Sequence, residues 1–228
     1  YVHGGFFKSE WTRDNTSTHC LLGQLPKTHA TLDLEYARVD QREPAASVGG
    51  GGWPHSNLDV LAGLNSAISF SDNHNLDLSR VYLVGHSAGG TLALWLGLLS
   101  RLSSAERASL AEAVRSEAGA EAVAALAAGV DARVRVVGVA AIAPVADLRV
   151  AASNGYSDSH DAVPNYFWRC GPHEDALDRA CPTALLRRLP SLGGADNSGE
   201  LRMLLIHGLS DVDVPPCEST RFASAVWS

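Results

Sequence analysis

The sequence has few cysteines, a single methionine and no long apolar run. Its four cysteines form no C-x-x-C pair and no cysteine–histidine cluster at zinc-ligand spacing, which argues against a structural zinc site. We expect buried thiols, and the spacing leaves a Cys170–Cys181 disulfide open as an alternative. The longest apolar stretch ends at Leu99 and is far shorter than the ~20 residues that cross a bilayer, so no membrane span is expected.

Basic residues are fewer than acidic residues. Lys and Arg number 18 against 25 Asp and Glu, which gives a formal charge of −7, and no Lys/Arg-rich run is present. Nucleic acid is therefore not expected as a partner. The 228 residues, 46% of them hydrophobic and 19% charged, fit one globular domain with a sizeable core, so we expect a single domain over residues 1–228.

The chain opens with Tyr1 and its only methionine is Met203, so we expect further residues before Tyr1. The opening YVHGGFF is too short and too rich in glycine to be a signal peptide, and it is typical of a strand that runs into a loop. The sequence leaves the compartment open, with the cytoplasm favoured.

Short apolar segments alternate with helical patterns along the chain. Strands are predicted at 31–39, 80–84, 133–143 and 201–207. Helices are predicted at 56–70, from a capping box of Ser56 and Asp59, at 91–99, and twice within 105–128 after a cap of Ser103 and Glu106. This order favours an α/β fold with a mostly parallel sheet and helices on both faces.

Residues 147–198 are rich in Gly, Pro, Asp and Ser. They predict an irregular, cap-like insertion with short helical pieces at 174–177 and 182–189. The glycine run 49–52 is followed by no phosphate-binding signature, so a flexible loop near the site is expected there.

The sharpest chemical signal is the G-x-S-x-G pattern at residues 85–89, which lies between a predicted strand and a predicted helix. Two glycines allow a turn tight enough to present Ser87 at the strand end, beneath the positive end of the helix. Ser87 is therefore the candidate nucleophile.

A second signal, HGGF at residues 3–6, lies far upstream of Ser87. Acyl transfer needs donors for an oxyanion, and backbone amides of Gly4, Gly5 and Phe6, together with that of Ala88, fit this role. An ordinary glycine turn is the alternative. His3 is expected to brace the loop rather than to move protons.

A third signal is HGLSDVDVP at residues 207–215, directly after a predicted strand. A serine nucleophile needs a histidine base, and the base needs a carboxylate that fixes its tautomer. Asp211 is the favoured acid, with Asp213 as its competitor. His207 ends a strand and His86 lies inside the turn, so both are expected to be structural.

With these motifs in order, the chain resembles the α/β-hydrolase superfamily, in particular its esterase, feruloyl-esterase-like and kynurenine-formamidase-like branch. HGGFF, GHSAGG and HGLSDVDVPP carry the resemblance from one end of the chain to the other. It implies a serine hydrolase with Ser87, Asp211 as the triad acid, and an oxyanion hole at Gly5, Phe6 and Ala88. The implied substrate is a small ester or amide, and no cofactor or metal is implied.

The chain departs from the family pattern at both ends. The family carries its catalytic histidine on a loop beyond the acid, and residues 212–228 contain no histidine. We expect that histidine after Ser228, and further strands before Tyr1, so that the chain is a fragment. His160 and His173 are the remaining candidates inside the insertion.

Two rival functions stay open at this point. One is a prolyl-oligopeptidase-type peptidase, which shares the turn and the acid loop. The other is a non-catalytic product that keeps the nucleophile and the acid but lacks the base.

Overall fold

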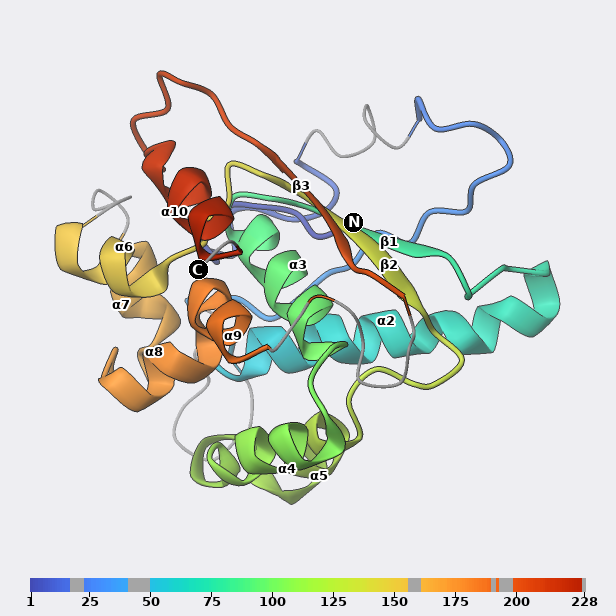
Figure 1. Cartoon of the computed structure of the whole chain (residues 1–228), viewed down its shortest axis with the longest axis horizontal. Helices are drawn as coiled ribbons and strands as arrows, with labels where there is room; N and C mark the ends of the chain where they lie inside the picture. The colour runs from blue at the N-terminus through green and yellow to red at the C-terminus, as the bar shows by residue number, and fades with distance from the viewer. Residues whose placement is uncertain (17–22, 41–49, 156–160, 190–191, 193–198, 227–228) are drawn as a thin grey trace.

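A computed structural model of the chain describes residues 1–16, 23–40, 50–155, 161–189, 192 and 199–226 (Figure 1). At its centre, β1 (Val81–His86), β2 (Val136–Ile142) and β3 (Arg202–Ile206) form a parallel sheet in the order β1-β2-β3. Three of the four predicted strands and the parallel sheet are therefore confirmed.

The strand predicted at 31–39 is wrong in extent. Only Leu34 pairs, through a single bridge to Val2, which in turn bridges to Gly85 at the edge of β1. The backbone beyond Leu34 forms no strand ladder. Ala37 N–H donates to the side chain of Asp59 in the helix at residues 55–74, and Val39 N–H donates to the Phe7 carbonyl. The alternation of the sequence still buries Leu34 on the core side.

Helix α3 (Ala88–Leu99) covers one face of the sheet, and every one of its residues is buried. An all-round apolar sequence is required there because the helix packs on the sheet and on two neighbouring helices, α2 (His55–His74) and α9 (Pro182–Arg188). Gly97 allows the close approach, since a methyl group on it would lie 2.4 Å from Val139 Cγ2.

The opposite side of the strands keeps exposed apolar side chains. Tyr82, Leu204 and Ile206 are 60%, 56% and 47% exposed. The pairing of the three strands places all three on one side of the sheet, away from Leu83 and Val139.

The capping box predicted at the start of α2 is wrong. The N-cap is Pro54 and carries no side-chain cap. Ser56 Oγ instead donates to the Ala37 carbonyl and accepts from Gly52 N–H, and Asp59 accepts from Ala37 N–H. Both side chains therefore form hydrogen bonds with backbone groups of the segments that pass the start of α2, instead of capping the helix.

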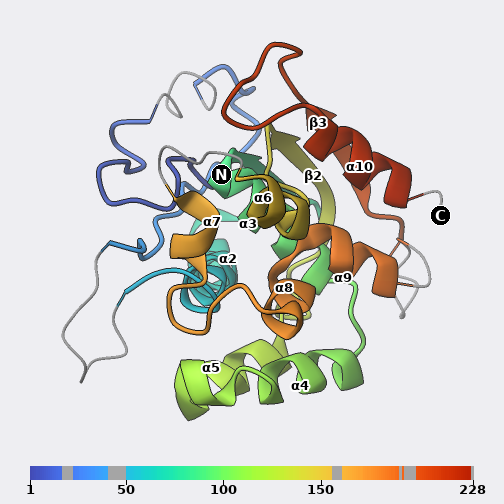
Figure 2. The ribbon, with the colours of Figure 1, turned by 90° about the vertical axis from the view of Figure 1, so that its left-hand side faces the viewer.

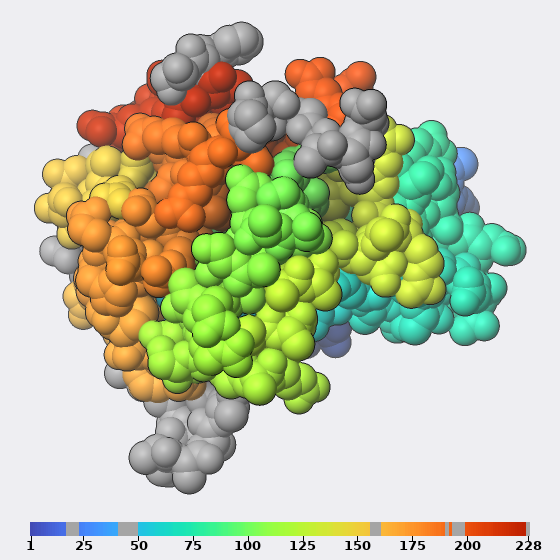
Figure 3. Space-filling model, turned by 60° about the horizontal axis from the view of Figure 1, so that its bottom comes forward, coloured from blue at the N-terminus to red at the C-terminus, as the bar shows by residue number. Residues whose placement is uncertain are grey.

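The second predicted cap is confirmed. Ser103 and Glu106 form a reciprocal capping box at the start of α4 (Ser104–Glu112), and α5 (Arg115–Ala128) follows with a break at Gly119, where φ is 77°. The two helices lie side by side and cover one end of the molecule (Figure 3). Both partners of this cap lie within one turn of the same helix, so local sequence decides the structure here.

The insertion is more helical than predicted. The expected pieces appear as α8 (Glu174–Ala180) and as α9, and the segment adds α6 (Leu148–Asn154) and α7 (Ala162–Tyr166). Figure 2 shows α9 between α10 (Cys217–Ala225) and the α4–α5 pair. Cys170 and Cys181 are free thiols, so the alternative of a disulfide is wrong. No helix in the described ranges is long and apolar enough to cross a membrane.

Helix α10, which the sequence pattern does not predict, is joined to the loop after β2 by the buried carboxylate of Glu218. Its Oε2 accepts from Asp147 N–H at 2.7 Å, and its Oε1 has no hydrogen-bond partner. Burial raises the pKa of Glu218 to about 7, and the neighbouring charge of Asp147 adds to the rise.

This carboxylate predicts a pH dependence of stability. The folded chain holds the Glu218 proton more tightly than the unfolded chain, so the free energy of unfolding should fall as the pH rises from 4.5 to about 7. The loss should reach about 2 to 3 kcal/mol. Glu218→Gln keeps an acceptor for Asp147 N–H without the charge, and should therefore be more stable than wild type at pH 8 and equal to it near pH 4.

Urea unfolding at several pH values measures this difference. Glu112→Gln, on the exposed surface of α4, is the matched control and should show no such pH-dependent gap. A gap between Glu218→Gln and wild type that stays constant from pH 5 to pH 8 would contradict the prediction.

Candidate active site

Ser87 lies at the junction of β1 and α3, in the tight turn that the motif predicts. Its backbone has φ 51° and ψ −123°, a conformation that non-glycine residues rarely adopt. The turn is held by Ser87 N–H, which donates to the Ile142 carbonyl at 2.8 Å, and by the Ser87 carbonyl, which accepts from Thr91 N–H at 3.0 Å. Ser87 is partly exposed at the carboxyl end of the sheet.

The two motif glycines are required by close backbone contacts. A methyl group at Gly85 would lie 2.2 Å from the Gly89 carbonyl oxygen. A methyl group at Gly89 would lie 2.2 Å from the Val2 carbonyl oxygen and 2.3 Å from that of His3. The turn therefore has room for glycine only, and one reason is the amino-terminal segment that crosses it.

That segment brings the glycine loop to Ser87. Val2 N–H donates to the Val84 carbonyl at 2.8 Å, and His86 N–H donates to the Val2 carbonyl at 3.3 Å, so residues 1–2 run beside β1. A methyl group at Gly4 would lie 3.0 Å from Ser87 Cβ. Residues separated by more than eighty positions in the sequence thus meet, as the oxyanion prediction requires.

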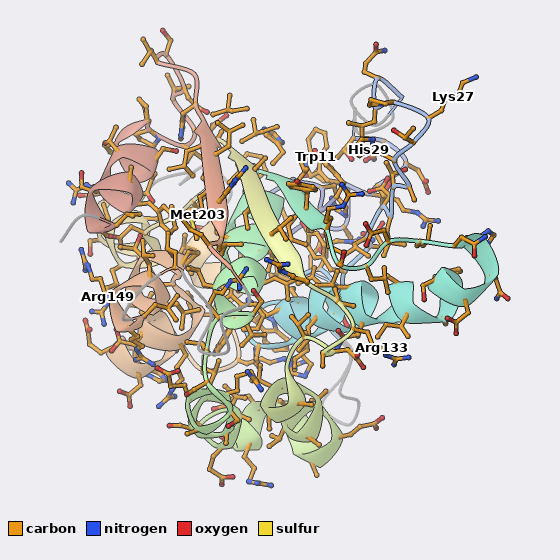
Figure 4. All side chains as sticks on the ribbon, turned by 45° about the vertical axis from the view of Figure 1, so that its right-hand side comes forward. Trp11, Lys27, His29, Arg133, Arg149 and Met203 are labelled. Carbon is orange, nitrogen blue, oxygen red and sulfur yellow. The ribbon has the colours of Figure 1, made fainter. Side chains whose placement is uncertain are left out.

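The loop after Gly4 has a left-handed backbone at three consecutive residues. The φ angles are 114° at Gly5, 54° at Phe6 and 59° at Phe7. Lys8 N–H donates to the Gly5 carbonyl and closes the turn. Trp11 packs so closely on Gly5 that a methyl group there would lie 2.1 Å from Trp11 Cβ. Figure 4 shows Trp11 near strand β1. Successive backbone N–H groups in a turn are a common form of anion-binding site, so this turn suits an anion.

Ala88 is the first residue of α3 and lies directly after Ser87. Backbone amides in the first turn of a helix have no acceptor within that helix, and the helix dipole makes them attractive to negative charge. The amide of Ala88 therefore suits the role of oxyanion donor that the sequence predicts for it.

Asp211 lies in the loop after β3, and its backbone and side chain organise that loop. Its Oδ1 accepts from Asp213 N–H at 3.1 Å and from Val214 N–H at 2.9 Å. Burial lowers the pKa of His86, and the negative charge of Asp211 opposes that shift. The Asp211 carboxylate therefore lies close enough to act electrostatically on the residue that precedes Ser87. Asp213 is exposed.

Both ring nitrogens of His207 are occupied, one by its own loop and one by helix α10. Nε2 donates to the Val214 carbonyl at 2.7 Å, so Nδ1 accepts from Ser219 Oγ, also at 2.7 Å. The 3.7 Å between His207 Nε2 and Asp211 Oδ2 is too long for a hydrogen bond. His173 caps α8 by accepting from Ala176 N–H, and His160 lies outside the described residues.

Two of the three tryptophans nearest the middle of the chain lie in the core. Trp53 and Trp95 are core residues, at most 2% exposed and packed edge to face at 5.9 Å, whereas Trp168 is partly buried. The glycines of the 49–52 run that the structure describes are buried rather than part of a flexible loop. A methyl group at Gly51 would lie 1.9 Å from the Ala37 carbonyl oxygen.

The part of the chain that the structure describes contains no group of three His, Cys, Asp or Glu side chains placed to hold a metal ion.

Two contributors to the site have no motif of their own. Trp11 supports Gly5, and Glu35 contacts His3 across the loop. The only sequence signal for Glu35 is its outward position in the alternating segment LEYARV.

No protein-family model matches the chain, and a search of curated proteins finds no match. Solved structures do match. A lipase/esterase from Lactobacillus plantarum aligns with a TM-score of 0.60 at 16% identity, over 99% of this chain and 74% of its own. An acetyl ester-xyloside bifunctional hydrolase from Caldicellulosiruptor lactoaceticus aligns with a TM-score of 0.60 at 18% identity, over 99% of this chain and 66% of its own. The chain has the α/β-hydrolase fold.

A carboxylesterase from Lactobacillus plantarum also matches, with a TM-score of 0.57 at 15% identity, and the chain covers 66% of its length. The expected α/β-hydrolase fold is thereby confirmed. In the α/β-hydrolase fold a strand, a tight turn and a helix present the nucleophile, and this is where Ser87 lies.

Proposed function

We propose that the protein is a serine hydrolase that cleaves a carboxylic ester or a small amide through an acyl-enzyme. The observation that carries the proposal is the strained backbone of Ser87 directly beside Gly4 of the glycine loop. Acyl transfer requires a nucleophile beside donors for an oxyanion, so the proximity of Ser87 and the glycine loop supports the proposal.

The reaction follows from these positions. Ser87 Oγ attacks the substrate carbonyl and loses its proton to a histidine base, and the carbonyl oxygen becomes an oxyanion. Amides of Gly5, Phe6 and Ala88 donate to that oxygen, and Gly4 lines the same site. Collapse of the tetrahedral intermediate expels an alcohol or an amine that takes up the proton, and water then cleaves the acyl-enzyme.

Asp211 orients the base in this proposal. The base is a histidine other than His3 and His207, because both ring nitrogens of these two bond elsewhere in the fold. His173 is not favoured either, because its Nδ1 caps α8. Asp211 is preferred to Asp213 because two backbone N–H groups fix Oδ1 and leave Oδ2 to accept from the imidazole.

The substrate class rests on the solved structures of the same fold. They are named lipase/esterase, carboxylesterase and acetyl ester-xyloside hydrolase, and an ester substrate for this chain agrees with those names. Assignment to the feruloyl-esterase-like or kynurenine-formamidase-like branch belongs to the same proposal and rests on the sequence motifs.

A fluorophosphonate probe tests the nucleophile directly. We expect one equivalent of probe on Ser87, located by mass spectrometry of the digested protein, and none on Ser87→Ala. Ser109→Ala, which removes an exposed hydroxyl from α4, should label like wild type. Labelling that persists in Ser87→Ala, or a wild-type protein that does not react at all, would refute the assignment.

A further inference from the structure

His3 is fully buried beneath the glycine loop, and each of its ring nitrogens makes a short hydrogen bond. Nδ1 lies 2.7 Å from the Gly4 carbonyl oxygen, and Nε2 lies 2.6 Å from Glu35 Oε1. Both distances lie in the range of strong hydrogen bonds and are too short for C–H contacts.

Both partners of His3 are acceptors. A carbonyl oxygen has no hydrogen to give, and an ionised carboxylate has none either, whereas a neutral imidazole carries only one N–H. Two bonds of this kind therefore require hydrogen on both nitrogens of His3. The ring is then an imidazolium, and Glu35 is its counter-ion.

The surroundings of Glu35 keep its carboxylate ionised. Arg38 Nη1 donates to Glu35 Oε1, and Arg13 N–H donates to Oε2 at 3.3 Å. Partial burial raises the pKa of Glu35, but the hydrogen bond and charge of His3, together with these donors, outweigh it and leave that pKa below its usual value. The proton between His3 and Glu35 accordingly resides on His3.

The other groups around His3 suit a cation. The ring of Tyr36 stacks on His3 with centroids 4.6 Å apart, which brings an aromatic face to the charge. Tyr36 hydroxyl donates to the His3 carbonyl at 3.1 Å. His86 lies on the other side of Gly4, where a methyl group on Gly4 would be 2.9 Å from its Nδ1.

We propose that His3 is a buried imidazolium, paired with Glu35, that fixes the Gly4 carbonyl and thereby aims the oxyanion donors of the loop at Ser87. The Gly4 carbonyl and the Gly5 N–H belong to one planar trans peptide and point in opposite directions. A bond from His3 to that carbonyl therefore sets the direction of the Gly5 N–H.

His3 is a positioning residue in this scheme, and its role rests on the proposed function of the loop. A fixed positive charge two residues before the first oxyanion donor of the loop also favours the negative charge that develops on the substrate.

Nuclear magnetic resonance of protein with 15N-labelled histidine tests the charge without any activity. We expect hydrogen on both nitrogens of His3 at pH 8, with the signals assigned by their loss in His3→Gln. In Glu35→Gln, which keeps an acceptor but removes the negative charge, we expect only one hydrogen on the His3 ring at the same pH. Glu112→Gln, which removes a carboxylate paired with Arg115 on the surface, should leave His3 unchanged.

The positioning role is read from the rate at which the fluorophosphonate probe labels Ser87. At pH 8 Glu35→Gln should label about ten-fold more slowly than wild type, since a displaced donor costs that much or more. The ratio should approach one as the pH falls and the imidazolium is restored. A purely structural defect would lower the rate equally at every pH.

The outcomes separate the two proposals. A wild-type His3 that carries only one hydrogen at pH 8 overturns the buried imidazolium, even if Ser87 reacts. A doubly protonated His3 with equal labelling rates for wild type and Glu35→Gln at every pH overturns the positioning role. A wild-type protein that is not labelled refutes the hydrolase and with it the positioning role, while the resonance spectrum still decides the charge of His3.

Discussion

Replacing Asp211 with asparagine is expected to lower kcat/KM for a short-chain aryl ester by about 10³- to 10⁴-fold in the active protein. The substitution is nearly isosteric. The carboxamide oxygen of the new side chain can still accept from the amides of residues 213 and 214, so the loop should keep its shape. Only the position of Oδ2 changes, from an acceptor to a donor, and a donor there favours the wrong histidine tautomer.

Asp213→Asn is the matched control because it makes the same chemical change two residues away, at an exposed side chain. It should alter kcat/KM by less than about three-fold. Ester hydrolysis is measured for both variants. Circular dichroism shows whether each variant is folded. A larger loss in Asp213→Asn than in Asp211→Asn would transfer the role of acid to Asp213.

Replacing Gly89 with alanine should cost about 3 kcal/mol of folding stability and slow the labelling of Ser87 by about ten-fold or more. The added methyl group would meet the carbonyl oxygens of Val2 and His3 at 2.2 and 2.3 Å. Backbone atoms cannot rotate aside, so the amino-terminal segment must move away from the turn. The glycine loop moves with it and leaves Ser87 without its neighbouring amides.

Gly208→Ala provides the comparison, since a methyl group at Gly208 has no neighbour within 4 Å. Its free energy of unfolding, measured with urea, should stay within about 0.5 kcal/mol of wild type, and its labelling rate should not change. If Gly89→Ala unfolds and labels like Gly208→Ala, the amino-terminal segment does not cross the turn as described.

The strands and the central helix could be predicted because their patterns leave few choices. The segment of α3 is apolar on all sides, and only burial on all sides accommodates it. Ser103 and Glu106 form the predicted cap since both partners lie within one turn of the same helix. The cap predicted from Ser56 and Asp59 has the same pattern. Both side chains instead form hydrogen bonds with the backbone of Ala37, which belongs to a distant part of the sequence.

The candidate site likewise contains one part that the local sequence predicts and one part that it does not. The turn at Ser87 follows from two glycines and a flanking strand and helix, all close together in the sequence, so a local motif identifies it. His3 and Glu35 lie 32 positions apart in the sequence, and no sequence motif predicts their contact. Such a contact is found only when the packing of both segments is known.

The sequence by itself determined the order of β1, α3, β2 and β3 and the tight turn at Ser87, because these depend on apolar periodicity and on residues a few positions apart. Only the tertiary structure decided that Gly4 meets Ser87, that His207 bonds within its own loop, and that His3 lies between two acceptors. The physical reason is that hydrogen-bond partners and steric neighbours of these groups come from segments that meet only when the sheet assembles.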